Sequence, residues 1–403
     1  MDRTGACAPR TTLRGHAVIR LGTRGSALAL TQSDFVADRL RAAGHAVERV
    51  IVHTRGDASD RPFRELEGKA FFTRELDLAL LAGAIDLAVH SLKDLPTDEP
   101  DGLASIGVLP RADPRDVLLL RRGIAARTRR DGLPELPAGT RVGTSSARRF
   151  AQLGRAFPGV VVADLRGNVP TRVARLRHGD FDAIVIAAAG IDRLSLDLAD
   201  LDRFALEPPA FLPAPGQGAL ACRIRAGDAA LRAALAPLVD PEAADGAVAE
   251  RRLLARLDGG CSLPLGALAR RTDEGIALRA CLARAGRHFE ADIVAATPDD
   301  AARLAHAVLL RRPIVVLTRP PELDADLVAL LRAHDLPFVE QPAIDFGELP
   351  TPPALAAALA RPGEFAAIAF TSKRAVASWC HHLVAHERPG GAVGRADRPP
   401  IAA

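Results

Sequence analysis

The stretch AVIRLGTRGSALAL, from Ala17 to Leu30, indicates the fold class of this 403-residue chain. Its apolar start predicts a strand, its Gly-containing centre a tight turn, and its Ala/Leu-rich end a helix that continues to about Ala43. The strand HAVERVIVHT follows, then a helix from Phe72 to Ala82 and the strand GAIDLAVHS. Strands that alternate with helices predict a parallel, doubly wound α/β sheet.

The same order of elements starts again further along the chain. PAGTRVGTSSARRFAQL predicts another strand, turn and helix, and the strand GVVVADL, a helix from about Asn168 and the strand DAIVIAAAG follow. A short link near residues 111–115, with Pro110 and Pro114, joins this second α/β domain to the first. The Pro/Gly-rich stretch PPAFLPAPGQGALACRIR predicts a crossing segment that ends in a strand.

The character of the sequence changes after Pro241. A helix from Glu242 to Leu257, the short strands GALARR, GIALRACLA and HFEADIVAA, and a helix from about Pro298 predict a small α+β domain. After residue 312 the α/β pattern returns with the strand PIVVLT and a helix through Ala333. We expect a disordered extension (1–16), a first α/β domain (17–113 with 219–237), a second (114–218), the α+β domain (238–311) and a partial α/β segment (312–403).

Composition excludes several classes of protein. Hydrophobic residues make up 48%, charged residues 25%, and the net charge is +4, as in a soluble globular protein. We expect no nucleic-acid partner, because no Lys/Arg-rich block with interleaved aromatics occurs, and no membrane span, because no long uncharged apolar stretch occurs. The N-terminus lacks an apolar signal region, so a cytoplasmic location is expected.

The five cysteines are far apart and form no C-x-x-C pair, so neither a disulfide framework nor a metal site is expected. Cys222, Cys281 and Cys380 are interpreted as buried filler. Cys261 is different because it follows two glycines in GGCSLPLG, and we consider it a candidate nucleophile or attachment point. A peptidase-like pair with His90 is conceivable, but no local pattern supports it.

Polar residues follow the predicted strands, at the sheet edge where α/β proteins bind ligands. Ser26 and Ser145 could each cap the next helix and favour an anion there, although such a Ser is usually only a cap. The polar segments are residues 23–26, 91–94, 143–146, 165–168 and 190 onward.

Arginines at the same positions favour a ligand with several negative charges, because a guanidinium group pairs bidentately with carboxylate or phosphate. One exposed Arg is usually a solvated surface charge, but five at equivalent positions are harder to dismiss. No G-x-x-x-x-G-K-[ST] loop is present, so carboxylates fit better than phosphate. The five are Arg24, Arg148, Arg149, Arg166 and Arg172.

Lysine is rare in this chain: Lys69, Lys93 and Lys373 are the three among 53 basic residues. Lys93 lies beside Asp94 in AVHSLKDLPT, at the end of a strand predicted to be buried. A retained lysine in such a background suggests a specific role for this pair.

Over roughly residues 19–310 the chain resembles the hydroxymethylbilane synthase (porphobilinogen deaminase) family. The stretches that carry the resemblance occur in order: LGTRGSALALTQ, EGKAFFTRELDLALL, DLAVHSLKDLPT, DPRD, VGTSSARR, LRGNVPTR, DAIVIAAAGIDRL, LPAPGQGALA and ERRLLARLDGGCSLPLGA. Ala27, Leu92, Asp258 and Leu263 depart from the usual residues without touching the expected chemistry.

The resemblance implies two domains shaped like the halves of periplasmic solute-binding proteins and a third that carries a dipyrromethane cofactor on Cys261 through a thioether. It implies a monomer that joins four porphobilinogen molecules head to tail, losing ammonia each time, to give hydroxymethylbilane in porphyrin and haem biosynthesis. Asp94 matches the catalytic carboxylate, which would bind pyrrole N–H groups and offset cationic azafulvene species.

Further site residues are implied by position in the matching stretches. Those expected at the cofactor, besides Cys261, are Ser91, Lys93, Thr144, Ser145, Ser146, Arg148, Arg149, Arg166 and Gly167. Those expected at the substrate are Arg24, Ser26, Lys69, Phe72, Arg172 and Gln217.

Residues 313 to about 386 resemble the start of uroporphyrinogen-III synthase, mainly in LTRP and FTSKRAV. That family needs about twice this length or more, so we expect a truncated or frame-shifted piece without activity, dispensable for the deaminase. The alternative function for the whole chain is a non-catalytic two-lobed binder of polycarboxylates, which would use the arginines but neither Cys261 nor Asp94.

Overall fold

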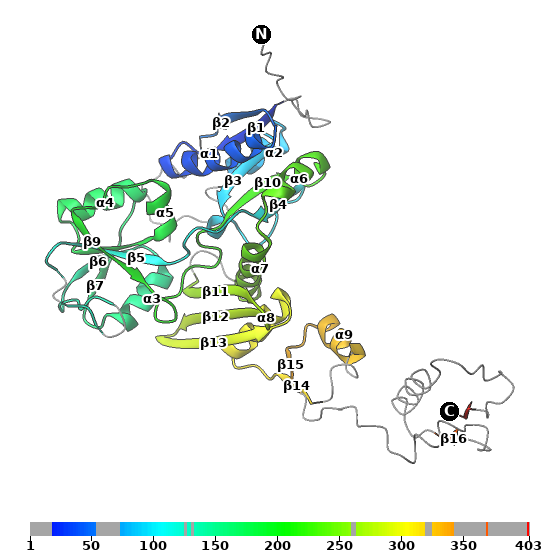
Figure 1. The fold of residues 1–403 in the computed structure, drawn as a ribbon. Coiled ribbons are helices and arrows are strands. Elements are labelled where there is room, and N and C mark those ends of the chain that lie inside the picture. Colours follow the sequence, from blue (N-terminus) through cyan, green and yellow to red (C-terminus); the bar gives the residue numbers. More distant parts are fainter. Residues whose placement is uncertain are drawn as a thin grey trace, which may run out of the picture. The chain divides into compact units, whose positions relative to one another are not determined.

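The computed structural model describes residues 18–53, 73–124, 127–129, 133–258, 263–318 and 325–341, and the short pairs 368–369 and 401–402. The chain divides into two compact units, Met1–Leu317 with Leu323–Gln341, and Thr318–Glu322 with Pro342–Ala403. In the described part of the second unit, β16 (Ile368–Ala369) and β17 (Ile401–Ala402) form a parallel pair. The helices and strands described below belong to the first unit and are labelled in Figure 1 where there is room.

The first lobe is a five-stranded sheet in the order β2-β1-β3-β10-β4, with helices on both faces. Leu87 and Val89 of β3 pack in the core with α1, whereas Ala88 between them packs with α2, as strand alternation requires. The elements are β1 (Ile19–Thr23), α1 (Ala27–Ala42), β2 (Val47–Ile51), α2 (Arg74–Leu81), β3 (Leu87–Ser91), the 3₁₀ turn η3 (Leu92–Asp94), β4 (Leu103–Val108), β10 (Leu220–Arg225), α6 (Ala229–Leu235) and η4 (Ala236–Leu238).

The second lobe repeats this plan in the order β7-β6-β8-β5-β9. Its core has two faces, one around Phe181 and Ile184 and the other around Val142 and Leu153. The elements are β5 (Asp116–Arg121), β6 (Arg141–Gly143), α3 (Ala147–Ala156), β7 (Val161–Ala163), α4 (Val169–His178), β8 (Ala183–Ala187), α5 (Ala188–Arg193) and β9 (Leu201–Leu206).

The chain crosses between the two lobes twice, and the strands that follow the two crossings, β5 and β10, are called the exchanged strands here. The chain leaves the first sheet after β4 and enters the second through β5, which runs antiparallel to β8 and β9; it returns through β10, which runs antiparallel to β3 and β4. The expectation of parallel sheets is therefore right for β1, β2 and β3 and for β6, β7 and β8, but wrong for the exchanged strands. Each exchanged strand arrives directly from the other lobe, without the crossover helix that makes two neighbouring strands parallel.

The third domain is the predicted α+β domain. Three antiparallel strands, β11 (Leu265–Thr272), β12 (Gly275–Arg284) and β13 (Arg287–Ala295), pair as consecutive hairpins. Helices α7 (Pro241–Arg256) and α8 (Pro298–Leu309) pack on the sheet, with Leu253, Leu278 and Ala302 in the shared core. The class predicted for the chain, two α/β domains followed by a small α+β domain, is confirmed.

The start of the C-terminal segment packs beside the third domain. It comprises β14 (Val315–Leu317), α9 (Ala325–Ala333) and β15 (Phe338–Glu340), with the two strands parallel. Asp335 accepts from Arg256 at 2.6 Å and from Arg303 at 3.0 Å, and Arg332 donates to Asp300 at 2.6 Å. Ion pairs thus join residues 325–341 to α7 and α8.

Candidate active site

Helices α1 and α3 each begin with a serine cap, at the sheet edges where β1 and β6 end. The Ser26 hydroxyl accepts from the Ala29 amide at 3.4 Å, and the Ser146 hydroxyl accepts from the Arg149 amide at 3.5 Å. The predicted cap Ser145 is wrong by one residue, because α3 begins at Ala147 and the N-cap is the residue immediately before it. The Ser145 hydroxyl instead donates to the Leu165 carbonyl at 2.7 Å.

Both arginines of the first turn of α3 bind the same buried carboxylate. Arg148 donates to Asp116 Oδ2 at 2.7 Å, and Arg149 donates to Asp116 Oδ1 from Nη2 at 2.7 Å and from Nε at 3.2 Å. Arg148 also donates to the Leu212 carbonyl, and Arg149 to the Val185 carbonyl. All three charged side chains are buried, so the guanidinium groups are rigidly held by the second lobe.

This cluster contains fewer negative charges than positive ones. Burial by itself would raise the pKa of Asp116, but the two guanidinium groups outweigh burial and hold that pKa well below its usual range. Burial lowers the pKa of Arg148, and the charge of Arg149 lowers it further. Arg148 Nε is buried and has no hydrogen-bond acceptor among the described residues.

Gln217 connects this cluster to the first lobe. Its amide nitrogen donates to Asp116 Oδ1 at 2.9 Å and to the Pro114 carbonyl at 2.7 Å, while its Oε1 accepts from Lys93 Nζ at 3.4 Å. Burial lowers the pKa of Lys93 to about 8; Asp94 and Asp116 oppose this shift, and Arg149 and Arg148 reinforce it. The structure thus places Lys93 within electrostatic reach of both α3 arginines.

Asp94 ends the turn η3 and is exposed, in contrast to the buried strand β3 before it. It lies close enough to Arg172 of α4 to raise the pKa of that group, but burial and Arg149 outweigh it and bring the value to about 10. Arg172 Nε donates to the Gly167 carbonyl at 2.7 Å. Asp94, Lys93, Arg149 and Arg172, from both lobes, therefore belong to one electrostatic cluster.

The other predicted residues of the described chain lie at the same strand ends. Ser91 at the end of β3 accepts from Gln32 of α1 at 2.9 Å, and the buried Thr144 hydroxyl accepts from the Ser146 amide at 3.3 Å. Arg24 and Arg166 follow β1 and β7 and are half-buried. Lys69, Phe72 and Cys261 lie outside the described residues.

His90 is not equipped to act as a base at this edge. It is buried in β3, and burial, Arg223 and Arg24 lower its pKa to about 3, so its imidazole binds a proton too weakly to act as a base. The peptidase-like pair considered from the sequence therefore has no support in the described part of the chain.

The two crossing segments, the second of which carries Gln217, run side by side. The Ala112 amide donates to the Gly218 carbonyl at 3.2 Å, and a Cβ atom on Gly218, whose φ is +86°, would lie 2.4 Å from the Ala112 carbonyl oxygen. Gly216, with φ of +73°, makes the turn on the other side of Gln217. Only glycine fits position 218, which explains the PGQG motif.

Three charged residues at these crossings were not singled out from the sequence: Asp116, Arg111 and Glu250. Arg111 donates to the Glu250 carboxylate from both terminal nitrogens, at 2.7 and 2.9 Å, and from Nε to the Gln217 carbonyl at 2.9 Å. Glu250, on α7, also accepts from the amides of Gly216 and Ala269. The signal for Asp116 was an acidic residue at the start of the apolar run DVLLLR.

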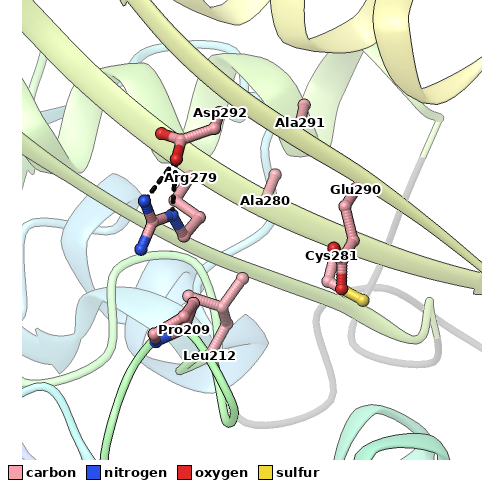
Figure 2. Close-up of a pocket in the computed structure, with 8 residues that line it drawn as sticks. All are labelled: Pro209, Leu212, Arg279, Ala280, Cys281, Glu290, Ala291 and Asp292. Atoms are coloured by element: carbon pink, nitrogen blue, oxygen red, sulfur yellow. Dashed lines mark hydrogen bonds and ion pairs between the residues drawn. The ribbon is translucent and has the colours of Figure 1, made fainter.

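A cavity of about 360 Å³ lies elsewhere, against strands β12 and β13 of the third domain (Figure 2). Pro209 and Leu212 of the second crossing form part of its wall, with Arg279, Asp292 and Cys281. Burial raises the pKa of the Cys281 thiol, which lies 3.7 Å from His288 Nδ1. Cys222 and Cys281 are both buried as expected, although Cys281 also lines this cavity, and Cys380 lies outside the described residues. No predicted site residue of the described chain contributes to this wall.

None of the helices in the described segments combines the length and the apolarity that crossing a bilayer requires. Within the same segments, no group of three or more His, Cys, Asp or Glu side chains is arranged to hold a metal ion.

Comparison with known proteins identifies the family. Residues 19–233 match the model of the porphobilinogen deaminase dipyrromethane cofactor-binding domain, and residues 245–309 match that of the porphobilinogen deaminase C-terminal domain. The chain belongs to the porphobilinogen deaminase family. Porphobilinogen deaminase of Nocardia farcinica is 44% identical over 314 residues, covering 75% of this chain and 86% of that protein. That of Mycobacterium marinum is 46% identical over 275 residues, covering 66% and 84%.

Porphobilinogen deaminase is hydroxymethylbilane synthase, so this chain is a transferase of tetrapyrrole biosynthesis that uses a dipyrromethane cofactor and porphobilinogen as substrate. It joins four porphobilinogen molecules head to tail with loss of ammonia. Among solved structures, a periplasmic binding protein of Salmonella typhimurium aligns with 56% of this chain and 92% of its own, at 11% identity and a TM-score of 0.34.

Proposed function

We propose that the cluster between the two lobes is the active site. In it, cations of the second lobe and Lys93 bind carboxylates of the ligand, and Asp94 is the catalytic carboxylate. One observation carries this proposal: the buried Arg148 and Arg149 share a single carboxylate, Asp116, and Gln217 connects that carboxylate to Lys93 of the other lobe. The lowered pKa values of Arg148, Lys93 and Arg172 agree with it, because burial and mutual repulsion exceed the opposing effect of Asp116 and Asp94. A ligand with several carboxylates would supply the missing negative charge.

Dipyrromethane fits this donor set, because each of its pyrrole rings carries an acetate and a propionate. Arg148 Nε, buried without an acceptor in the described chain, offers a donor for one of them. Arg166 and the Gly167 backbone follow β7, Thr144, Ser145 and Ser146 follow β6, and Ser91 ends β3. When bound, the cofactor supplies the primer onto which porphobilinogen units are added.

Cys261 is proposed as the attachment point, through a thioether. Asp94 is proposed as the catalytic carboxylate, since its exposure leaves it available to substrate while Lys93 and Arg172 lie near. It would accept hydrogen bonds from pyrrole N–H groups and offset positive charge that develops on the substrate. Arg24, Ser26, Lys69, Phe72, Arg172 and Gln217 are proposed to contact the substrate.

The test is formation of the covalent cofactor from porphobilinogen. Protein made without porphobilinogen is incubated with it, and the intact mass is measured after denaturation. The wild-type chain should gain the mass of the dipyrromethane and then release hydroxymethylbilane with ammonia, whereas Cys261→Ala should gain nothing. Cys222→Ala, which alters a buried core thiol, is the control and should behave like the wild type. A pyrrole adduct on Cys261→Ala would refute the attachment.

The enzyme is further proposed to be monomeric and cytoplasmic, with no nucleic-acid or membrane partner. The segment from residue 312 is proposed to be a uroporphyrinogen-III synthase-like piece without the activity of that enzyme. Incubation with hydroxymethylbilane, followed by separation of the type I and type III uroporphyrin isomers, tests the latter; a type III product would contradict it.

A further inference from the structure

Asp116 is the first residue of β5 and one of the charged residues not assigned a role from the sequence. It is fully buried, and it accepts hydrogen bonds from three side chains, Arg148, Arg149 and Gln217. No other described carboxylate binds both arginines that the proposed function places on the ligand. It lies at the junction of the first crossing segment with the second sheet.

The geometry around Asp116 fixes which way each arginine faces. Oδ2 binds Arg148 through one terminal nitrogen, while Oδ1 binds Arg149 through Nε and Nη2. A guanidinium group is planar and its five N–H groups have a fixed arrangement, so anchoring one edge orients the rest of Arg149. Arg148 is held at Nη1, which donates both to Asp116 and to the Leu212 carbonyl. Arg148 Nε remains without an acceptor in the described chain.

Asp116 also determines the orientation of the Gln217 amide. An ionised carboxylate only accepts hydrogen bonds, so Gln217 must turn its NH₂ group toward Asp116, where it donates at 2.9 Å. Gln217 Oε1 is then directed to Lys93, whose Nζ lies 3.4 Å away. The carboxylate of the second lobe thus orients the acceptor that holds the lysine of the first.

We propose that Asp116 is a positioning residue, which aligns Arg148 and Arg149 directly and Lys93 through Gln217, so that cations of both lobes meet one polycarboxylate ligand. This inference rests on the proposed function, because it assumes that these three cations bind the cofactor or the growing chain. Asp116 itself has no exposed surface with which to touch that ligand.

The principal test is Asp116→Asn, with Asp86→Asn as the matched control. Asp86 is equally buried, and it also accepts from two arginines, Arg20 and Arg225, but it lies just before β3, at the opposite end of that strand from Ser91. Both substitutions remove one buried charge and keep the side-chain shape. Thermal stability should fall in both variants.

The variants should differ in cofactor assembly and in pH dependence. Asp116→Asn should lower kcat/KM for porphobilinogen on the order of 10²-fold, the usual effect of misplacing binding groups, and leave a larger apo fraction by intact mass. The groups facing Lys93 are Asp94, Asp116, Arg148 and Arg149, and Asp116 favours the charged amine. Its removal should therefore move the alkaline limb of the pH profile to lower pH, whereas Asp86→Asn should leave that limb unchanged.

If Asp116→Asn does not fold, two further variants decide the question. Asp116→Glu keeps the charge but moves it by one methylene. Gln217→Met removes the hydrogen bonds of Gln217 to Asp116, Pro114 and Lys93 and leaves both arginines paired with Asp116. Both should slow cofactor assembly and lower kcat/KM. Wild-type assembly and kcat/KM in both would overturn the proposal, as would a folded Asp116→Asn variant that matches Asp86→Asn.

Failure of the proposed function gives a different result. Arg148→Gln and Arg149→Gln test directly whether the arginines bind the ligand. If both assemble the cofactor and turn over like the wild type, the arginines do not bind carboxylates and the positioning role falls with them. If both fail while Asp116→Asn matches its control, only the role of Asp116 is refuted.

Discussion

The two lobes have the same strand order but differ in the burial of the charged residues that they bring to the proposed active site. In the second lobe Arg148, Arg149 and Asp116 are buried and bound to one another. In the first lobe Lys93 is half-buried and Asp94 is exposed, on a single 3₁₀ turn after β3. The shared topology thus places equivalent strand ends in both lobes, while burial distinguishes the rigidly paired charges of the second lobe from the exposed carboxylate of the first.

The largest effect that tests this comparison is expected from Arg149→Leu. Removing this partner leaves the buried Asp116 carboxylate short of positive charge, so unfolding free energy should fall by roughly 3–5 kcal/mol, as for other broken buried pairs. Arg203→Leu is the control, because its pair with Asp192 is about half exposed and should be worth at most about 1 kcal/mol. Chemical denaturation measures both, and equal losses would show that burial of the arginine cluster has no special weight.

Asp94→Asn should have the reverse profile, with a large loss of rate and little change in stability. Removing the charge should slow turnover at least ~10²-fold, equivalent to about 2.7 kcal/mol, while the melting temperature stays close to that of the wild type. Asp94→Glu should retain some activity and accumulate enzyme–intermediate complexes. Asp101→Asn, another exposed residue of the first lobe, is the control. A lowered melting temperature with normal turnover would make Asp94 a structural cap instead.

The pH profile distinguishes the cations of the two lobes. Lys93 has a pKa of about 8, lowered by burial, so it carries its charge below that pH and loses it above. If the charged amine binds the ligand, kcat/KM should fall by roughly tenfold per pH unit above this value, and bound carboxylates should shift the corresponding limb of kcat to higher pH. Lys93→Arg should move the kcat/KM limb upward; an unchanged limb would exclude Lys93 as its origin.

The smallest effects are expected from the two helix caps, one in each lobe. Ser26→Ala and Ser146→Ala should each cost about 1 kcal/mol of stability through the loss of one capping bond. Ser145→Ala tests whether Ser145 contributes to the cap of α3, since its hydroxyl donates to the Leu165 carbonyl and not to the helix. A similar melting temperature for Ser146→Ala and the wild type would show that Ser146 contributes no cap.

The sequence predicted the elements better than their connections. Strand and helix periodicity is local, so β1, α1, α7 and the three strands of the third domain were found from the sequence alone. The expected domain bounds already return residues 219–237 to the first domain, but no strand was expected at β5. Nothing local marks β5 and β10 as antiparallel, because their apolar runs resemble those of any buried strand.

The arginines were visible as a cluster, but their common partner was not. Asp116 is separated from Arg148 by 32 residues and from Gln217 by 101, and only the folded sheet brings them together. The cap of α3 was misplaced by one residue because Thr144, Ser145 and Ser146 are all suitable cap types, and only the observed start of the helix distinguishes them.

Strand exchange also has a consequence for synthesis of the chain on the ribosome. β10 lies between β3 and β4 and is bonded to both, so β4 has no partner in its sheet until residues 220–225 have been made. The second lobe has all five of its strands once residue 206 has been made. An emerging chain therefore carries an unpaired strand edge, the kind of surface on which other chains add, throughout translation of the second lobe. The lobe that is synthesised first is completed last.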